Sequence, residues 1–388
     1  MNHNFDIIIP REGTNCVKFD LRKTYFGREE VIPMWVADMD FPVPPFVSKA
    51  VRKRAEHPVY GYSIIPESFY RAVIEWQNRR HGWEIRKDWM LFSPGVVTGL
   101  NVIVQALTDP GDKIIVQPPV YFPFFSSVEK NGRKLLYNQL VEKNGVYTID
   151  FDDLENKMKA GARMLILCSP HNPVSRCWTR DELEWLGSKS LEYGVLVVSD
   201  EIHCDLVFEP HHHIPLATLS EEIAQNTITC IAPSKTFNLA GLFTSSIIIA
   251  NDSLRRRFKH AEEKIHLSAN IFGITAAEAA YRDGEEWLGE LMTYLKSNAE
   301  LVKDFLAVNL PEIAVSPIEA TYMLWLDFRQ LGFSAPDLKN RLIEKAGLGF
   351  VEGPSFGPGG NGFQRMNIAC PRVTLESALK RIPLILNY

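Results

Sequence analysis

Short apolar runs alternate with amphipathic segments through the middle of the chain, between residues 85 and 250. The runs are WMLFS from residue 89, KIIVQ from 113, RMLILC from 163, VLVVS from 195, TITCIA from 227 and SSIIIA from 245. Runs of this length between amphipathic segments are typical of buried strands in a parallel sheet that helices cover on both faces. The pattern therefore predicts an α/β fold with a mainly parallel sheet.

One of the intervening helices has both ends marked in the sequence. Thr179 and Glu182 have the spacing of a capping box, in which each side chain bonds the backbone of the other residue. Gly194 supplies the residue type that commonly ends a helix. The apolar stripe between these ends consists of Leu183, Leu186 and Leu191.

A longer helical pattern runs from Glu285 to about Leu310, just before Pro311. We interpret it as the bridge into a smaller C-terminal domain, because the texture of the sequence changes after it. The predicted organisation is an N-terminal segment over 1–45 that packs with the small domain, a large cofactor-binding domain over 46–285 and a small domain over 286–388. The Gly- and Pro-rich stretch 352–363 is predicted to be a loop before a strand.

Composition narrows the class of function. The 388 residues include 42 basic and 47 acidic side chains, giving a net charge of -5, and no long basic run. That balance gives no electrostatic case for a nucleic-acid or anionic-membrane partner, so we expect a small-molecule substrate. The chain has no apolar stretch of about 18 residues, and its six cysteines form no CxxC pair. We expect reduced thiols and a cytoplasmic location.

Two charged residues follow predicted strands. Lys235 lies in IAPSKTFNLAGL after an apolar strand, and Asp200 ends the strand VLVVSD. Ligands bind at the carboxyl edge of α/β sheets, and a carboxylate in a central strand is costly without a cation. A protonated pyridine nitrogen is one such partner. The alternatives are a solvated surface lysine and an aspartate that caps the following segment.

Further candidates follow other strand ends. Asn172 precedes Pro173 and has an amide that can donate to a phenolate oxygen, although Asn-Pro alone indicates only a turn. Tyr121 could stack on a planar cofactor or simply pack in the core. Backbone amides that suit a phosphate at a helix N-terminus belong to Gly95, Val96 and Val97.

Arginine and histidine provide the remaining candidates. Arg372 in NIACPR could bind a substrate carboxylate through two hydrogen bonds, although exposed arginines are commoner. Adjacent His211, His212 and His213 cannot all face one metal ion on a regular element, so a solvated loop is expected and no metal. His171 is at least as well explained by a structural role.

Taken in order, these segments resemble the pyridoxal 5'-phosphate (PLP) enzymes of fold type I that include the class I/II aminotransferases. The closer resemblance is to the MalY/PatB/cystalysin group of cysteine-S-conjugate (cystathionine) β-lyases. It is carried by MWVADMDFPVPP, VYGYSIIP, PVYFPFF, SPHNPVSRCW, SDEIHCDLVF and APSKTFNLAGL. The resemblance covers nearly the whole chain and implies a large domain with a mainly parallel seven-stranded sheet between helices, plus a smaller α/β C-terminal domain.

The resemblance implies roles for the residues in these motifs. Lys235 attaches the PLP and takes the Cα proton, Asp200 pairs with the ring nitrogen, and Tyr121 stacks on the ring. Tyr62 reaches the phosphate of a neighbouring subunit, which implies a homodimer with shared sites. The resemblance also implies cofactor contacts for Asn172, His203, Ser234, Gly95, Val96 and Val97. It implies substrate contacts for Arg372, Val36 and Asn172.

Two positions differ from the aminotransferase pattern. His203 stands three residues after Asp200, where many aminotransferases have tyrosine, and Phe243 stands where they often have a phosphate-binding arginine. Both favour β-elimination from cysteine S-conjugates, giving pyruvate, ammonia and a thiol. Two alternatives remain: an aminotransferase that uses the same site, and a regulator that keeps the fold and acts through a partner protein. The aromatic residues that could suit an apolar thioether are Trp35, Tyr121, Phe122 and Phe124.

Overall fold

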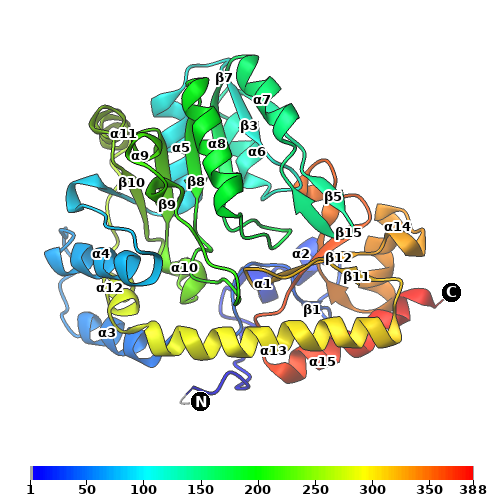
Figure 1. Cartoon of the computed structure of the whole chain (residues 1–388). Coiled ribbons are helices and arrows are strands. Elements are labelled where there is room, and N and C mark those ends of the chain that lie inside the picture. Colours follow the sequence, from blue (N-terminus) through cyan, green and yellow to red (C-terminus); the bar gives the residue numbers. More distant parts are fainter. Residues whose placement is uncertain (1–2, 388) are drawn as a thin grey trace.

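The computed structural model describes residues 3–387 and has a seven-stranded sheet at its centre (Figure 1). The strand order is β2-β10-β9-β8-β7-β3-β4, and β10 runs antiparallel to its two neighbours while the other pairs are parallel. The strands are β2 (Met90–Ser93), β3 (Lys113–Val116), β4 (Lys134–Tyr137), β7 (Ala162–Cys168), β8 (Leu196–Asp200), β9 (Thr227–Ile231) and β10 (Ser245–Ile249). All six apolar runs are strands here, which confirms the predicted fold class.

Alternate residues of each strand pack against helices on opposite faces of this sheet. On β7, Met164 and Ile166 join the core with α5 (Val96–Leu107), α6 (Pro123–Glu129) and α11 (Asp252–Lys264). Leu165 and Leu167 join the core on the other face, with α7 (Phe151–Lys159), α8 (Arg180–Glu192) and α9 (Glu221–Gln225). Burial on both faces explains why the strands are continuous apolar runs rather than alternating ones.

The predicted ends of α8 are present. The Thr179 hydroxyl accepts from the Glu182 backbone, the Glu182 carboxylate accepts from the Thr179 backbone, and Gly194 has a φ of 62°. The predicted long helix is α13 (Glu285–Asn309), which runs along the lower side of the molecule in Figure 1. Near its start lie α3 (Pro45–Ala55), α4 (Glu67–His81) and α12 (Ile271–Asp283).

After α13 the chain forms a four-stranded antiparallel sheet in the order β11-β12-β15-β14. Its strands are β11 (Ala314–Val315), β12 (Met323–Asp327), β14 (Val351–Glu352) and β15 (Phe363–Asn367). The helices α14 (Ala335–Asn340) and α15 (Arg372–Arg381) accompany it. From the N-terminal part of the chain, β1 (Ile32–Pro33) pairs with β13 (Leu348–Gly349), which joins the N-terminal segment to the part of the chain that follows α13.

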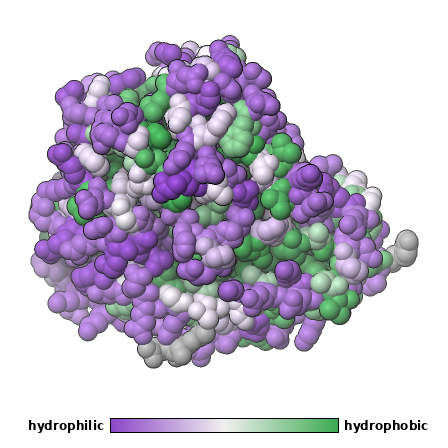
Figure 2. Space-filling view, in the orientation of Figure 1, coloured by the Kyte–Doolittle hydropathy of each residue, from purple (hydrophilic) through white to green (hydrophobic). Residues whose placement is uncertain are grey.

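The surface in the orientation of Figure 1 is mainly hydrophilic, with hydrophobic side chains gathered right of centre (Figure 2). That position corresponds to the region where Figure 1 shows α2 (Arg22–Phe26) beside β11 and β12. Within residues 3–387, no helix combines the length and the apolar composition that crossing a membrane takes.

Candidate active site

A cavity of about 280 Å³ lies where β7, β8 and β9 end, at the carboxyl edge of the large sheet. This is the edge at which α/β proteins bind ligands. Nine of the ten residues predicted to contact the cofactor line it: Gly95, Val96, Val97, Tyr121, Asn172, Asp200, His203, Ser234 and Lys235. Their elements are far apart in sequence, so the parallel sheet is what brings these side chains together.

Asp200 is the last residue of β8, and only 4% of its surface is exposed. Its carboxylate accepts one hydrogen bond, 3.2 Å from the backbone nitrogen of Ile202. Burial raises the pKa of Asp200 to about 7. A buried carboxyl with so little support is suited to a cationic ligand group.

Lys235 lies in the short helix α10 (Pro233–Thr236), directly after β9. Burial and, to a smaller extent, the nearby Arg365 guanidinium lower the pKa of its amine to about 8, against the opposing effect of Asp38 and Asp200. The amine Nζ donates to the backbone oxygen of Ala37 at 2.7 Å. An amine with a lowered pKa is a competent nucleophile and base near neutral pH.

The N-terminus of α5 faces the same cavity. Gly95 is the residue before this 12-residue helix and gives it no side-chain cap, so the first backbone N–H groups stay available to an anion. The hydroxyl-bearing residues Thr98, Ser234 and Thr244 line the cavity as well. Phe243, which is 62% exposed and has a φ of 47°, also lines the cavity. Its aromatic side chain makes this part of the rim hydrophobic.

Tyr121, Asn172 and His203 form further parts of the wall. The Tyr121 backbone nitrogen donates to the Asn172 carbonyl at 3.1 Å, which couples the two loops. Burial lowers the pKa of His203 well below its usual range, so its ring is neutral, and its Nδ1 has no hydrogen-bond partner among residues 3–387. The His203 ring lies edge-on to Tyr322, with centroids 6.1 Å apart.

Arg365 is a site residue that sequence reasoning missed. It lies in the middle of β15 and is 3% exposed. Its Nη1 donates to the Asn172 side-chain oxygen at 3.0 Å, its Nη2 donates to the Trp35 carbonyl at 2.8 Å, and its Nε has no partner in the described chain. Burial lowers the pKa of Arg365 to about 10. The sequence carried little signal for it, because only Phe363 and Met366 of the strand FQRMN are apolar, and the burial of all five residues is apparent only in the structure.

The prediction for Arg372 is wrong. This arginine is the first residue of α15, its guanidinium donates to the backbone and side-chain oxygens of Ser297 on α13, and it lines neither of the cavities described here. The chain turns into α15 after β15, which directs Arg372 toward α13 rather than toward the sheet edge. Arg365 occupies the position that we expected for Arg372.

A second cavity of about 420 Å³ adjoins the first and shares Ala37, Tyr121 and Lys235 with it. Its remaining wall is mainly apolar, with a charged pair in which Lys339 Nζ lies 2.8 Å from Glu352 Oε1. The other lining residues are Tyr25, Phe26, Trp35, Val36, Phe122, Leu342, Ile343, Leu348, Phe350, Val351, Ser355, Gln364 and Arg365. We call it the apolar chamber.

The chamber contains three of the four aromatic residues expected around an apolar substrate. Trp35, Tyr121 and Phe122 line it, and so does Val36. Phe124 does not, because it lies on α6 and is fully buried in the core that α5, α6 and α11 form with the sheet. The expectation for Phe124 was therefore wrong.

Tyr62 lies outside both cavities and is fully exposed. It belongs to a loop before α4 and lines a surface pocket together with Tyr60, Ser268 and Ile271. In the part of the chain that the structure describes, Tyr62 is therefore separate from the residues that line the candidate site.

The histidine triplet is only partly a solvated loop. His211 and His212 are exposed, but His213 is buried and its Nε2 lies 2.9 Å from Glu201 Oε2, so the expectation was wrong for His213. His171 is buried against Trp178, and burial lowers its pKa to about 3, so it is neutral. His171 does not line the cavity, which supports its structural interpretation.

These residues fit a planar ligand with three chemical groups. An aldehyde could condense with the Lys235 amine, a protonated ring nitrogen could pair with the poorly supported Asp200 carboxyl, and a phosphate could bind at the α5 N-terminus. Tyr121 supplies an aromatic wall for the ring. The fold and the site thus define the class of α/β proteins that hold a cofactor between a strand-end aspartate and a lysine.

Comparison with known proteins identifies the family. The chain matches the family model "Aminotransferase class I and II" over residues 29–382 and belongs to that family. It is 45% identical over 386 residues to the cystathionine β-lyase PatB of Bacillus subtilis, covering 99% of this chain and 100% of the relative.

Two solved structures are also close. One is cystalysin from Treponema denticola, described as containing a pyridoxal 5'-phosphate cofactor, with a TM-score of 0.97, 37% identity and coverage of 100% of this chain and 99% of that one. The other is the PLP-bound C-S lyase from Staphylococcus hominis, with a TM-score of 0.93, 34% identity and coverage of 100% and 99%.

Proposed function

We propose that this protein is a PLP-dependent C-S lyase. It catalyses β-elimination on L-cystathionine and other L-cysteine S-conjugates, giving pyruvate, ammonia and a thiol. The observation that carries the proposal is the cavity in which Asp200 and Lys235 meet, opening into an apolar chamber. The relatives named as cystathionine β-lyase and C-S lyase support the same activity.

The cofactor-binding residues follow from this cavity. Lys235 attaches the cofactor, Asp200 keeps its ring nitrogen protonated, and Tyr121 packs on the ring. The raised pKa of Asp200 returns toward its usual range once a ring cation lies opposite, because the attraction favours the ionised carboxyl. The phosphate is held by the hydroxyl of Ser234 and by the backbone N–H groups that follow Gly95.

When bound, the cofactor supplies an electron-poor conjugated ring that stabilises negative charge at the substrate Cα. The Lys235 amine removes the Cα proton, and its lowered pKa places it near the working range of a general base. The Cβ–S bond then breaks, the sulfur leaves as a thiolate, and hydrolysis of the remaining three-carbon unit gives pyruvate and ammonia.

Arg365 binds the substrate carboxylate in this proposal. Its Nε has no partner within residues 3–387, while its contacts with Asn172 and Trp35 fix the plane of the guanidinium. A fixed planar guanidinium suits two parallel hydrogen bonds to a carboxylate. The β-substituent then extends into the apolar chamber, away from water.

The test uses the purified protein with PLP and L-cystathionine. We expect pyruvate and homocysteine in equal amounts without any keto acid. Strict dependence on 2-oxoglutarate would instead identify an aminotransferase. Lys235→Ala is expected to abolish pyruvate formation, and a Lys235→Ala protein with an unchanged biological effect would favour the regulator alternative.

The functional unit is proposed to be a homodimer in which Tyr62 reaches the neighbouring phosphate site. The segment around Tyr62 supports this, because Val59, Tyr60 and Ile64 are all more than half exposed. Large apolar side chains clustered on one exposed loop favour a protein partner.

Six free thiols, five of them buried, favour a reducing compartment, which we take to be the cytoplasm. The division at residues 45 and 285 stays a prediction.

A further inference from the structure

The loop of residues 35–39 crosses the junction of the two cavities, and each of its backbone carbonyls accepts a hydrogen bond from a side chain. The donors come from widely separated parts of the chain. They are Arg365 for Trp35, Asn367 for Val36 and Asp38, Lys235 and Tyr322 for Ala37, and Arg11 and Asn238 for Met39.

The Ala37 carbonyl is the part of this loop that contacts the proposed catalytic lysine. The Lys235 amine donates to it at 2.7 Å and the Tyr322 hydroxyl at 3.0 Å. In the PLP-loaded protein, the Lys235 amine would be free only once the substrate has displaced it from the cofactor, and it would then be able to remove the Cα proton. The Ala37 carbonyl is therefore placed to hold the amine while it acts as the base.

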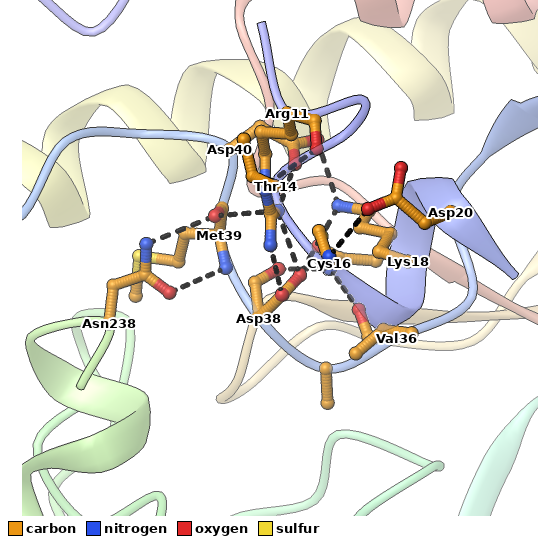
Figure 3. A network of polar contacts seen from close by, with 12 residues as sticks. Arg11, Thr14, Cys16, Lys18, Asp20, Val36, Asp38, Met39, Asp40 and Asn238 are labelled. Carbon is orange, nitrogen blue, oxygen red and sulfur yellow. Dashed lines mark hydrogen bonds and ion pairs between the residues drawn. The ribbon is translucent and has the colours of Figure 1, made fainter. Parts of the chain in front are cut away.

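Four charged side chains clamp the next part of the loop (Figure 3). Arg11 bonds Asp38 at 2.5 Å and Asp40 at 2.6 Å, and Lys18 bonds Asp40 at 2.8 Å and lies 3.6 Å from Asp38. Two cations and two carboxylates balance in charge. Lys18 is only 1% exposed, so its ammonium depends on these carboxylates for solvation.

The cations of this cluster are themselves held in place by a tight turn, which Figure 3 also shows. The Asp20 carboxylate accepts from the backbone nitrogen of Cys16 at 2.8 Å, and the Thr14 hydroxyl donates to the Arg11 carbonyl at 2.6 Å. The turn fixes the distance between Arg11 and Lys18. The cluster therefore holds Asp38 and Asp40, and with them the loop, in a fixed position, in addition to neutralising charge.

We propose that Arg11, Lys18, Asp38 and Asp40 form a positioning cluster that fixes the Ala37 carbonyl as the acceptor for the free Lys235 amine during proton removal. This inference rests on the proposed lyase activity. An amine that donates one hydrogen to a fixed carbonyl keeps its lone pair in a defined direction, and proton transfer depends strongly on that direction. The four charged residues are positioning residues, and Lys235 remains the catalytic one.

The test is Lys18→Met in the PLP-loaded protein, which removes the ammonium but keeps most of the stem. We expect kcat to fall about 10- to 100-fold, because a displacement of about 1 Å at the reacting atoms has an effect of that size. The deuterium isotope effect on kcat with substrate labelled at Cα should rise, since proton removal becomes slower than the later steps. Amide hydrogen exchange should increase in residues 34–41.

The matched control is Arg22→Gln, which breaks the 2.6 Å ion pair with Glu12 in the same N-terminal segment without touching the loop. It should leave the isotope effect and the exchange of residues 34–41 at wild-type values. Lys18→Arg should restore most of kcat. If Lys18→Met does not fold, Asp40→Asn replaces it, because that change removes a partner of Lys18 at constant size.

An unchanged isotope effect and unchanged exchange in residues 34–41 would overturn the positioning role, and so would equal effects in the Arg22→Gln control. The outcomes separate this inference from the proposed function. Absence of elimination by the wild-type protein would refute the lyase activity, whereas normal wild-type activity with an insensitive Lys18→Met variant would refute only the cluster's role.

Discussion

Asp200 and Lys235 are shifted in opposite directions by the same cause, which is burial. The pKa of the acid is raised to about 7 and that of the amine is lowered to about 8. Burial disfavours the charged form of each group, and their mutual attraction offsets only part of that cost. Binding a cofactor that offers Asp200 a cation and consumes the Lys235 amine relieves both groups at once.

The first prediction concerns Asp200→Asn in protein from which the cofactor has been removed. The folded pKa of Asp200 lies above its ordinary value of 3.8, so folding favours the protonated acid and the associated stability is lost as pH rises from about 4 to about 7. Asparagine does not titrate. The Tm of Asp200→Asn minus that of the wild type should therefore increase over this pH range, as measured by calorimetry.

Adding PLP should reduce the Tm advantage of Asp200→Asn over the wild type. The wild type gains an ion pair with the ring nitrogen that asparagine cannot provide, so its Tm should rise more than that of Asp200→Asn. Equal gains from PLP in both proteins would argue against the Asp200 contact with the ring.

The second prediction separates the two arginines near the C-terminus. Arg365→Lys should raise KM for cystathionine about 10-fold or more, because lysine cannot form the paired hydrogen bonds of a guanidinium. Arg372→Lys should change KM less than about 2-fold, since Arg372 contacts Ser297 and lines neither cavity. Steady-state kinetics on both variants decide the matter, and the reverse order would restore the original assignment to Arg372.

At the scale of elements, α12 supports the loop that follows Lys235. Gly273 lies in the first turn of α12, and a Cβ there would lie 2.2 Å from the Thr244 hydroxyl and 2.4 Å from the Leu242 carbonyl. The backbone carbonyl cannot rotate away as a side chain can. The helix must therefore approach this loop without a side chain at that position.

The third prediction is that Gly273→Ala weakens PLP binding. Displacing Leu242 and Thr244 should move the cavity wall, and overpacking of this kind commonly costs about 1–3 kcal/mol of stability. The dissociation constant for PLP, measured by absorbance, should rise about 10-fold. Gly289→Ala in α13 is the control, because nothing in the described part of the chain lies within 4 Å of its added Cβ and a helical alanine should stabilise by about 0.5–1 kcal/mol.

The sequence was sufficient for features that depend on local composition. The strand that ends at Asp200, the capped helix from Arg180 and the bridging helix from Glu285 all lie where the patterns predicted them. The position of Arg365 was not predictable in this way, because its partners Asn172 and Trp35 are far away in the chain. The side-chain hydrogen bonds to the carbonyls of residues 35–39 were not predicted for the same reason, since their donors become neighbours only after folding.

At the scale of the whole molecule, the exposed Tyr62 loop is the part of a single chain that a second chain best explains. The loop contributes nothing to its own cavity, yet the resemblance implies a phosphate contact for Tyr62. A symmetric dimer resolves this, because each chain can place the loop at the site of the other.

The fourth prediction follows from shared sites. Lys235→Ala and Tyr62→Ala homodimers should each be strongly impaired, and mixing them under subunit exchange should restore about a quarter of wild-type activity, because half of the dimers are hybrids with one intact site. Pyruvate release measures the recovery, and sedimentation velocity verifies the dimer. No recovery, with exchange demonstrated by mass labels, would show that Tyr62 acts within its own chain or not at all.

The order in which the site residues occur along the chain bears on protein synthesis. The cofactor cavity is lined by residues up to Thr244, whereas Arg365, which we propose binds the substrate carboxylate, belongs to β15, more than a hundred residues later. A ribosome releases these parts in that order. A growing chain can therefore assemble the lining for its vitamin B6 derivative before it has any means of holding an amino acid, and substrate binding is the last capacity that translation completes.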